Sequence, residues 1–472
     1  MRHFLALAAF ALAAGAVAQS PSAPPSDPWH AKAREIYASA IAFQTVEGRN
    51  ASPEMADYLA GELRSAGFND VTVRRHDQTA ALVLRWPAAR PSGRKAMLLL
   101  AHMDVVEARR EDWSRDPFTL TEEEGYFYGR GTLDNKQGVV GITAALMRLR
   151  AEGFRPNRNI IVLFTGDEET TGRGAELAAG EWLDLSTIDF ALNGDAGGGA
   201  YLPNGELLGF GLQTSEKIYQ SFTLTATNPG GHSSRPRPDN AIYSLAHALA
   251  RLEAHRFAPM LNETTRAYFT DRLRTAEPPL AAAIRRWLAD PADGAAADAV
   301  EASPTEVGLT RTRCVATMLA GGHAENALPQ MARATVNCRL FPGVDPAGVI
   351  ATLRELAGAD VTVEPVREAR PSPPSPLRPD VVGAYTDAVR ARHRGAVIVP
   401  EMSTGATDGL YFRARGLPVY GVGGPWIVVP ADERAHGRDE RLPVRAFYDN
   451  VDHWTFLVRR LAGPEAAGRR RR

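Results

Sequence analysis

The sequence predicts an α/β protein in which a discontinuous α/β domain is interrupted by an inserted α+β domain. Two apolar runs of strand length, residues 95–106 and 160–164, suit strands that are buried on both faces of a parallel sheet. Segments with helical periodicity separate such runs, as in βαβ units. The same alternation returns near residue 379, after a long stretch of different character, and this return indicates the interruption.

Length and charge limit the classes of protein to consider. A chain of 472 residues is too long for one ordinary domain, so two are expected. It carries 54 Lys and Arg residues against 55 Asp and Glu residues. This balance predicts no general attraction to nucleic acid or to an anionic membrane.

Residues 1–18 read as a signal peptide. Arg2 and His3 give a short basic start, residues 4–14 form an apolar run too short to span a bilayer, and Ala-Val-Ala at 16–18 fits a cleavage site. A buried N-terminal helix is the alternative, but the segment has no polar face. We therefore expect an exported protein, periplasmic or secreted, with no membrane attachment after cleavage.

Residues 19–212 are predicted to form the first part of the α/β domain. Pro53, next to Ser52, marks a helix start, because Pro is favoured at the first helical position. Alternating strands and helices in this part predict a mostly parallel sheet. The predicted helices span 30–46, 52–67, 137–150 and 174–183, and the predicted strands span 71–75, 81–86, 95–106, 160–164 and 190–195.

The pattern changes near residue 212, and we assign residues 213–366 to the inserted domain. A Pro-rich linker at 365–379 precedes the second part of the α/β domain, residues 367–465, and residues 466–472 are a basic tail. In the insert we expect strands at 218–226, 310–319 and 332–341, the last two antiparallel, and helices at 239–255 and onward to 302. In the second part we expect helices at 379–393 and 447–461 and strands at 396–399 and 419–422.

Three adjacent carboxylates, Asp167, Glu168 and Glu169, follow the strand at 160–164. They repel one another, so a positive partner such as a metal ion is expected. The carboxyl ends of strands are also where open α/β sheets place their active sites. The alternative for such a triplet is a solvated acidic loop.

His102 and Asp104 close another buried strand. Alternate strand residues share a face, and a local bend would also let Asp104 hold the imidazole of His102. Asp134 lies in Gly-Arg-Gly-Thr-Leu-Asp-Asn-Lys before a helix, a loop without the ending of a phosphate loop. Taken alone, His102 reads as a satisfied histidine and Asp134 as a helix N-cap.

Two further candidates complete a set of metal-binding side chains. Asp195 ends the strand at 190–195, and His436 lies in a late loop; a turn and a solvated histidine are their alternatives. The set of two imidazoles and three carboxylates suits zinc or a similar divalent ion: His102, Asp134, Glu169, Asp195 and His436. Asp134 is able to bridge two ions, and Glu168 is then free to act as a general base.

With these motifs in order, the sequence resembles the M20 family of co-catalytic zinc exopeptidases and amidohydrolases. The resemblance rests on His-x-Asp, Gly-Arg-Gly-x-x-Asp-x-Lys, Glu-Glu, a later Asp, Gly-His-Ser and a late His. It implies a zinc-exopeptidase-type α/β catalytic domain whose insert is a lid, and two divalent ions, zinc with cobalt or manganese as alternatives. It implies that His102 and Asp195 bind one ion, that Glu169 and His436 bind the other, that Asp134 bridges them, that Asp104 orients His102, and that Glu168 is the base.

The resemblance also assigns residues outside the metal set. His232, in Gly-Gly-His-Ser-Ser, matches the lid histidine that stabilises the oxyanion, and Asn326 and Arg339 match substrate-binding residues. Thr407 lies in a loop near the substrate, where Ala406 replaces the more usual Gly. The family's lid often carries a homodimer interface, although the long stretch at 256–302 argues against the usual lid-to-lid contact.

The expected function is hydrolysis of peptide bonds in small peptides by a dipeptidase or other exopeptidase. Asp195 favours this reading, since Asp at this ligand position tends to go with peptidases in the family and Glu with acyl-amino-acid hydrolases. The substrate should carry a free carboxylate, which Arg339 matches with a planar pair of donors. The alternatives are an N-acyl-amino-acid amidohydrolase and an inactive binding protein on the same fold.

Cys314 and Cys338 are the only cysteines and lie on the two predicted antiparallel strands. A hairpin centred near Asn326 would bring them opposite each other, and an exported protein meets an oxidising compartment. We therefore predict a disulfide, with two buried free thiols as the alternative.

Overall fold

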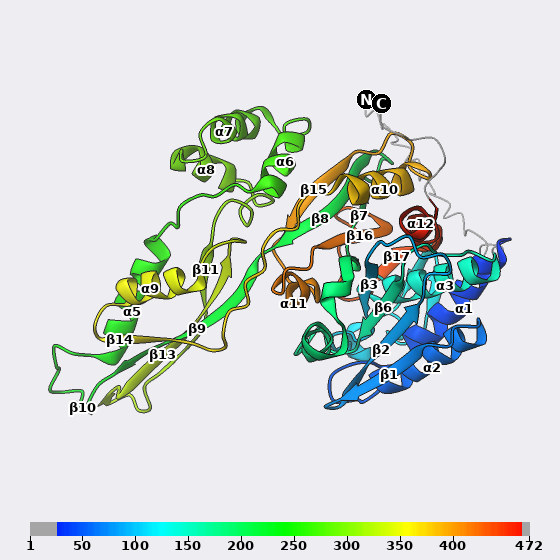
Figure 1. Ribbon diagram of the computed structural model, residues 1–472. Helices are drawn as coiled ribbons and strands as arrows, with labels where there is room; N and C mark the ends of the chain where they lie inside the picture. The colour runs from blue at the N-terminus through cyan, green and yellow to red at the C-terminus, as the bar shows by residue number, and fades with distance from the viewer. Residues whose placement is uncertain (1–25, 465–472) are drawn as a thin grey trace, which may run out of the picture.

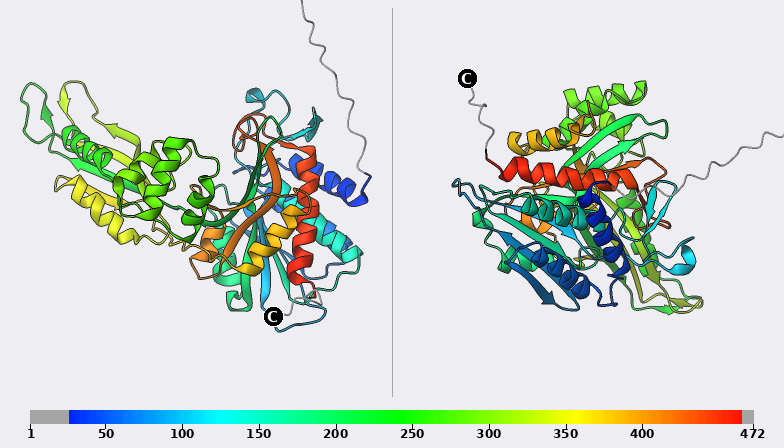
Figure 2. Two further views of the ribbon diagram at one scale, coloured as in Figure 1. Left: turned by 90° about the horizontal axis from the view of Figure 1, so that it is seen from above. Right: turned by 90° about the vertical axis from the view of Figure 1, so that its right-hand side faces the viewer.

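The computed structural model describes residues 26–464, so the predicted signal peptide and the basic tail lie outside the described residues. An eight-stranded sheet organises one part of the molecule and a four-stranded sheet the other. The second part projects from the first as an elongated arm (Figures 1 and 2). The predicted fold class, an α/β catalytic domain with an inserted lid, is confirmed; the exact domain boundaries stay a prediction.

The large sheet has a parallel centre and antiparallel margins. Its strand order is β1-β2-β6-β3-β7-β16-β8-β15. Strands β6, β3, β7 and β16 run parallel, whereas β1 and β2, β2 and β6, and β7 and β8 pair antiparallel. The strands are β1 (Val71–His76), β2 (Thr79–Trp86), β3 (Ala96–His102), β6 (Ile160–Thr165), β7 (Ile188–Tyr201), β8 (Leu207–Glu216), β15 (Ile398–Ser403) and β16 (Val419–Val428).

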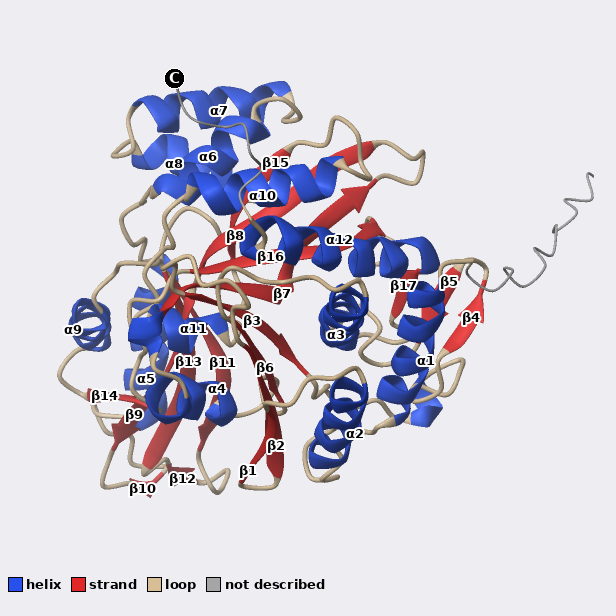
Figure 3. Ribbon diagram, turned by 45° about the vertical axis from the view of Figure 1, so that its right-hand side comes forward, coloured by secondary structure: helices blue, strands red, loops and turns tan. Residues whose placement is uncertain are grey.

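Helices cover both faces of this sheet, because successive strand residues point to opposite sides. Leu82 and Leu84 of β2 join one hydrophobic core, and Ala81 and Val83 join the other. The larger core packs under α1 (Pro28–Ala42), α2 (Ser52–Ser65), α3 (Lys136–Ala151), α10 (Pro379–Arg390) and α12 (Val444–Ala462) (Figure 3). The smaller core packs under α4 (Arg173–Leu177) and α11 (Gly409–Arg413).

A small three-stranded sheet pairs residues 441–443 with the segment that precedes the Asp134 loop. It contains β4 (Thr121–Glu123), β5 (Tyr126–Tyr128) and β17 (Arg441–Pro443) in the order β17-β5-β4. These strands are too short for their periodicity to predict them. Short helical turns occur at η1 (Arg110–Asp112), η2 (Ala178–Trp182) and η3 (Leu185–Thr187).

The lid is built on the four-stranded antiparallel sheet β11-β13-β9-β14. Its strands are β9 (Ile218–Thr227), β11 (Arg313–Gly321), β13 (Met331–Leu340) and β14 (Val361–Pro365). Helices α5 (Ala241–Ala254) and α9 (Pro346–Ala357) form one core with this sheet. At the tip, β10 (Gly231–His232) pairs with β12 (Ala327–Leu328).

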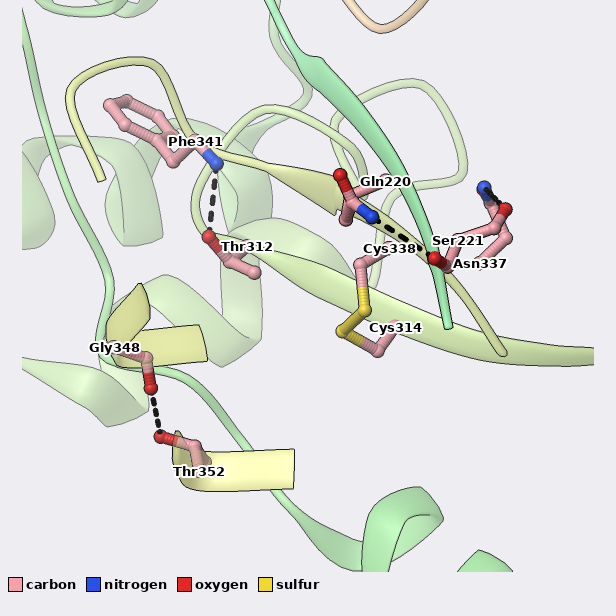
Figure 4. Close-up of a disulfide and its surroundings, with 9 residues drawn as sticks. All are labelled: Gln220, Ser221, Thr312, Cys314, Asn337, Cys338, Phe341, Gly348 and Thr352. Atoms are coloured by element: carbon pink, nitrogen blue, oxygen red, sulfur yellow. Dashed lines mark hydrogen bonds between the residues drawn. A yellow bond between two sulfur atoms is a disulfide. The ribbon is translucent and has the colours of Figure 1, made fainter. Parts of the chain in front are cut away.

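Cys314 and Cys338 form a disulfide between β11 and β13 (Figure 4). The two residues lie directly opposite each other in the antiparallel register, with Cα atoms 4.0 Å apart. Strand β11 is an edge of the lid sheet, so the disulfide fastens that edge to its only neighbour.

The helical middle of the insert packs against the catalytic part. It comprises α6 (Glu263–Arg272), α7 (Pro278–Ala289) and α8 (Gly294–Glu301). Its core contains Phe269 and Trp287 and also takes in Met402 of β15, and α6 lies against β15. This position explains why the stretch at 256–302 is longer than a lid alone requires.

The structure differs from the sequence predictions mainly at element ends. Strand β3 ends at His102, so Asp104 lies in the following loop and not on the strand. Strand β7 continues through a glycine run to Tyr201, and β8, α9 and β14 were not predicted. No helix within residues 26–464 is long and apolar enough to cross a membrane.

Candidate metal centre and active site

The candidate metal ligands come from five separate segments that meet at the carboxyl edge of the large sheet. His102 ends β3, Glu169 follows β6, and Asp195 lies within β7. Asp134 lies just before α3, and His436 lies in the loop between β16 and β17. Because β3, β6 and β7 are parallel, their carboxyl ends meet at one edge, which is why residues distant in sequence come together.

These residues form two groups that share Asp134. Nε2 of His102 lies 3.0 Å from Oδ1 of Asp134 and 3.2 Å from Oδ1 of Asp195. Nε2 of His436 lies 3.1 Å from Oδ2 of Asp134 and 2.9 Å from Oε1 of Glu169. In each group the ligand atoms lie within 4.8 Å of one another. The two oxygens of Asp134 thus face two different imidazoles, as a carboxylate that bridges two ions would require.

The electrostatics of the two groups also fit divalent cations. Burial lowers the pKa of His102, but the charge of Asp195 and hydrogen bonds to Asp104 and Asp134 outweigh it and raise that pKa well above its usual value. Hydrogen bonds to Asp134 and Glu169 raise the pKa of His436 to about 10. The carboxylates therefore hold positive charge on both imidazoles, and a bound cation would meet the same demand while displacing those protons. Each group offers one nitrogen and two carboxylates, which suits a catalytic zinc site with an open position.

Asp104 supports both the histidine and the glutamate pair. Its backbone oxygen lies 3.0 Å from Nδ1 of His102, and its Oδ1 lies 3.4 Å from the same atom. Its carboxylate also accepts hydrogen bonds from the backbone N–H groups of Glu168, at 3.1 Å, and Glu169, at 2.9 Å. Asp104 thus orients the imidazole mainly through its backbone and fixes the Glu168–Glu169 turn through its side chain.

Glu440 holds the loop that carries Asp134, a role that the sequence did not predict. Its carboxylate is fully buried and accepts hydrogen bonds from the backbone N–H groups of Leu133, at 2.7 Å, and Asp134, at 3.0 Å. It also pairs with Arg130 at 2.6 Å. Since Glu440 follows His436 by four residues, one carboxylate ties the His436 loop to the Asp134 loop. The sequence signal for this contact was Arg130 in the Gly-Arg-Gly motif, because a buried arginine needs a carboxylate partner.

Glu168 faces an open cavity of about 680 Å³ that also contains Glu169, His436 and Arg339. Burial is the main cause that raises the pKa of the Glu168 carboxyl well above its usual value. The Arg339 guanidinium stacks over the Tyr219 ring at 4.6 Å and forms no ion pair among the described residues. The candidate base and the candidate carboxylate-binding arginine therefore line the same cavity.

Thr407 lines this cavity, but its polar atoms are engaged within the protein. Its backbone N–H and hydroxyl donate to the buried Glu216 carboxylate at 3.0 and 3.1 Å. Its role in substrate binding stays a prediction, and within the protein its hydroxyl serves to hold the loop against Glu216. The neighbouring Asp408, which the sequence reasoning did not single out, accepts a hydrogen bond from Thr165 and has one buried oxygen without a partner.

His232 and Asn326 lie together at the lid tip, where the Ser233 N–H donates to the Asn326 backbone oxygen at 3.0 Å. In Figure 1 the β10 label marks this tip, at the end of the arm away from the catalytic sheet. Arg339 lies at the other end of β13, roughly 25 Å away along a strand that rises about 3.4 Å per residue. Within one chain, Asn326 and Arg339, both assigned to substrate binding by the resemblance, are therefore separated by the length of β13 and do not contact the same carboxylate.

Two groups of candidate metal ligands at the carboxyl edge of an α/β sheet, combined with a projecting lid, are the arrangement expected of a co-catalytic metal-dependent hydrolase. The sequence profile of Peptidase family M20/M25/M40 matches residues 98–460, and the chain belongs to this family. It is accordingly a hydrolase that acts on peptide or amide bonds, as the resemblance implied, and its family is metal-dependent.

Known relatives include enzymes named for acyl amino acids and for peptides. The N-fatty-acyl-amino acid synthase/hydrolase PM20D1 of Xenopus tropicalis is 30% identical over 373 residues, which cover 76% of this chain and 71% of that protein. Aminoacylase-1 of Mus musculus is 31% identical over 389 residues, or 80% and 83% of the two chains. The M20 family metallo-carboxypeptidase Sso-CP2 from Sulfolobus solfataricus has the same fold, with a TM-score of 0.67 at 18% identity over 90% of this chain and 98% of that chain.

Proposed function

We propose that this protein is a two-metal exopeptidase that hydrolyses dipeptides or other short peptides with a free C-terminal carboxylate. The observation that carries the proposal is the shared Asp134 between two ligand groups, beside a cavity that holds both Glu168 and Arg339. Such a cavity combines the groups for water attack with a binding group for the end of a peptide.

The metal-binding residues divide into two sets with one member in common. His102 and Asp195 would hold one ion, Glu169 and His436 the other, and Asp134 both. When bound, zinc, cobalt or manganese would supply Lewis-acid stabilisation of negative charge and make water more acidic. Asp104 and Glu440 position these ligands through the hydrogen bonds described above.

Glu168 is the proposed general base. It is not needed as a ligand and lines the cavity beside Glu169, a position from which it would accept a proton from the attacking water and deliver it to the leaving nitrogen. Arg339 would bind the substrate carboxylate in a bidentate manner, held in place by its stacking on Tyr219.

N-acyl-amino-acid hydrolysis is the second candidate, favoured by the names of the relatives that are 30% and 31% identical. The identity of Asp195 supports the peptidase reading, by the tendency within the family described above. An inactive binding protein on the same fold is the least supported, because no metal ligand and no candidate base has been lost.

Export, assembly and localisation are part of the proposal. The segment at 1–18 supports a periplasmic or secreted protein. The uncovered edge of β11 supports a homodimer through the lid, since Met318 and Leu319 on that strand expose 69% and 72% of their surface.

The decisive experiment is a substrate panel with the metal-depleted protein reloaded with zinc, cobalt or manganese. Each of several dipeptides is compared with the N-acetyl form of the same dipeptide, with its C-terminal amide, and with N-acyl amino acids. An exopeptidase of the proposed kind hydrolyses the free dipeptides with the highest kcat/KM and loses at least about tenfold, or 1.4 kcal/mol, on C-terminal amidation. Turnover restricted to the N-acyl amino acids would establish the second candidate instead.

A further inference from the structure

A second open cavity, of about 660 Å³, is lined partly by segments that also carry candidate metal ligands. Three of its lining residues lie close in sequence to candidate ligands: Leu133 precedes Asp134, Gly197 follows Asp195, and Glu433 precedes His436. The cavity that contains Glu168 and Arg339 shares none of these three residues. Segments that carry three of the candidate ligands therefore also line this second cavity.

Backbone atoms form part of the wall of this second cavity. Gly198 of β7 lies opposite Gly211 of β8 in the register, and both line the cavity. A Cβ atom at Gly211 would lie 2.4 Å from the carboxylate of Glu401. The Glu401 carboxylate thus lies directly on the β8 backbone, in space that only a glycine leaves free. The lining also includes Tyr268 and Arg272 of α6 from the helical insert.

Four acids line this cavity, and among the described residues Glu401 and the exposed Glu433 have no ion-pair partner. Arg272 pairs with Glu306 at 2.7 Å, and Asp271 pairs with Arg274 at 2.8 Å. Glu401 itself has no hydrogen-bond or ion-pair partner there, and burial raises the pKa of its carboxyl to about 7. A carboxylate in such a position is costly unless a cation meets it.

The distance from the metal centre limits which cation fits. Gly198 lies three residues after Asp195 on β7, a rise of roughly 10 Å along the strand. An α-ammonium group next to the scissile bond is too close to that bond to reach Glu401. A long basic side chain reaches further, and its methylene stem would lie along apolar lining residues such as Leu133 and Ile427.

We propose that Glu401 binds the ammonium or guanidinium group of a Lys or Arg side chain on the substrate residue that supplies the scissile carbonyl. The inference deepens the proposed exopeptidase function and rests on it. The two cavities then carry opposite unpaired charges, Arg339 for the substrate carboxylate and Glu401 for the substrate cation. The enzyme selects short peptides with a basic residue on the acyl side of the cleaved bond.

The test compares lysyl-alanine with norleucyl-alanine, which has nearly the same stem without the ammonium group. We expect wild-type kcat/KM to favour the lysyl substrate by at least about tenfold, and Glu401→Gln to reduce that ratio to about one. Asp271→Asn, in the same cavity but at a carboxylate already paired with Arg274, should keep the wild-type ratio. A wild-type ratio near one, or a ratio that survives Glu401→Gln, overturns the proposal.

Binding of uncleavable analogues separates this inference from the proposed function. The reduced-amide forms of the same two dipeptides are titrated into the metal-loaded protein by calorimetry, so the result does not require turnover. We expect about tenfold tighter binding of the lysyl analogue to wild type and equal binding of both to Glu401→Gln. Turnover of neither dipeptide would refute the exopeptidase function, whereas norleucyl turnover with no lysyl preference in either assay would refute only the role of Glu401.

Discussion

At the scale of single residues, the carboxylates of this protein have different roles because their surroundings differ. Asp134 faces two imidazoles, so it stays ionised and is suited to bridge cations. Glu440 is equally buried but accepts backbone hydrogen bonds and pairs with Arg130, so it fixes a loop. Glu168 and Glu401 lack a cationic partner among the hydrogen bonds and ion pairs of the described chain, and burial raises the pKa of both. These two are therefore the carboxylates available to a substrate or its proton.

Replacing Glu168 tests the division between base and ligand. We expect Glu168→Gln to lower kcat on the order of 100-fold or more, since general-base loss has that effect, while the metal content per chain stays near wild type. The contrasting variant Glu169→Gln should lose metal, because Glu169 contacts His436 in one of the two ligand groups. Elemental analysis of dialysed protein and steady-state kinetics measure both quantities. Metal loss in Glu168→Gln, or unchanged turnover, would contradict the assignment.

Glu401 also gives a prediction about stability and pH. Its pKa rises from 4.5 in the unfolded chain to about 7 in the folded protein, so the folded protein holds a proton that the unfolded chain has lost across that window. The free energy of unfolding therefore falls as pH rises from about 4.5 to 7. Glu401→Gln removes this pH-dependent loss of stability. The melting temperature of the variant minus that of wild type should therefore be larger at pH 8 than at pH 5. A difference that is the same at both pH values would mean that the carboxyl is not buried as described.

The site residues that the sequence predicted are placed by their own segment, whereas those it missed depend on contacts with distant segments. His102, Glu169 and Asp195 were predictable because each closes or follows an apolar run, so its position at the sheet edge is a local property. Glu440 contacts Leu133 across 307 residues, and Glu401 meets a glycine on another strand. Such pairings arise only when the chain folds, so neither residue carries a local signal.

At the scale of elements, the same reasoning separates buried strands from edge and irregular ones. Strands β3 and β6 are apolar throughout and were predicted, because both faces of a central parallel strand are buried. Strand β8 contains two glycines, and it was missed because glycine weakens the strand pattern. In the lid, β11 has seven exposed residues in a row and depends on its pairing with β13.

The disulfide should therefore stabilise β11 specifically. Its two cysteines are 24 residues apart, and closure of a loop of that length contributes about 3 kcal/mol in the chain-entropy description. We expect reduction of wild type to speed hydrogen exchange of the β11 amides far more than that of β6 amides in the catalytic sheet. Titration of unfolded, unreduced protein should find no free thiol. Two reactive thiols per chain, or equal exchange before and after reduction, would exclude this role.

At the scale of the whole molecule, the lid places His232 far from the metal centre of its own chain. Strand β9 leaves the catalytic part after Lys217 and runs ten residues outward, a rise of roughly 33 Å, before the chain reaches the tip. The sequence could not predict this distance between His232 and the metal centre. The resemblance assigns His232 a role but does not say where in the molecule it lies. Either the lid closes over a large distance, or a second copy of the chain supplies the histidine.

The uncovered edge of β11 favours the second copy, and mixing variants tests this directly. His232→Ala alone should lower kcat roughly 100- to 1000-fold, as expected for loss of an oxyanion donor, and Glu168→Gln alone is impaired as above. In a symmetric dimer each mixed pair has one complete site, formed by Glu168 of one chain and His232 of the other. Random mixing in equal amounts therefore restores about one quarter of wild-type activity, because about half of the dimers are mixed and half of their sites are complete. Mixing the same variants after cross-linking each into its own dimer is the control and should restore nothing. If mixing by subunit exchange restores no activity, although sedimentation shows that exchange occurred, then His232 acts within its own chain and the lid must close.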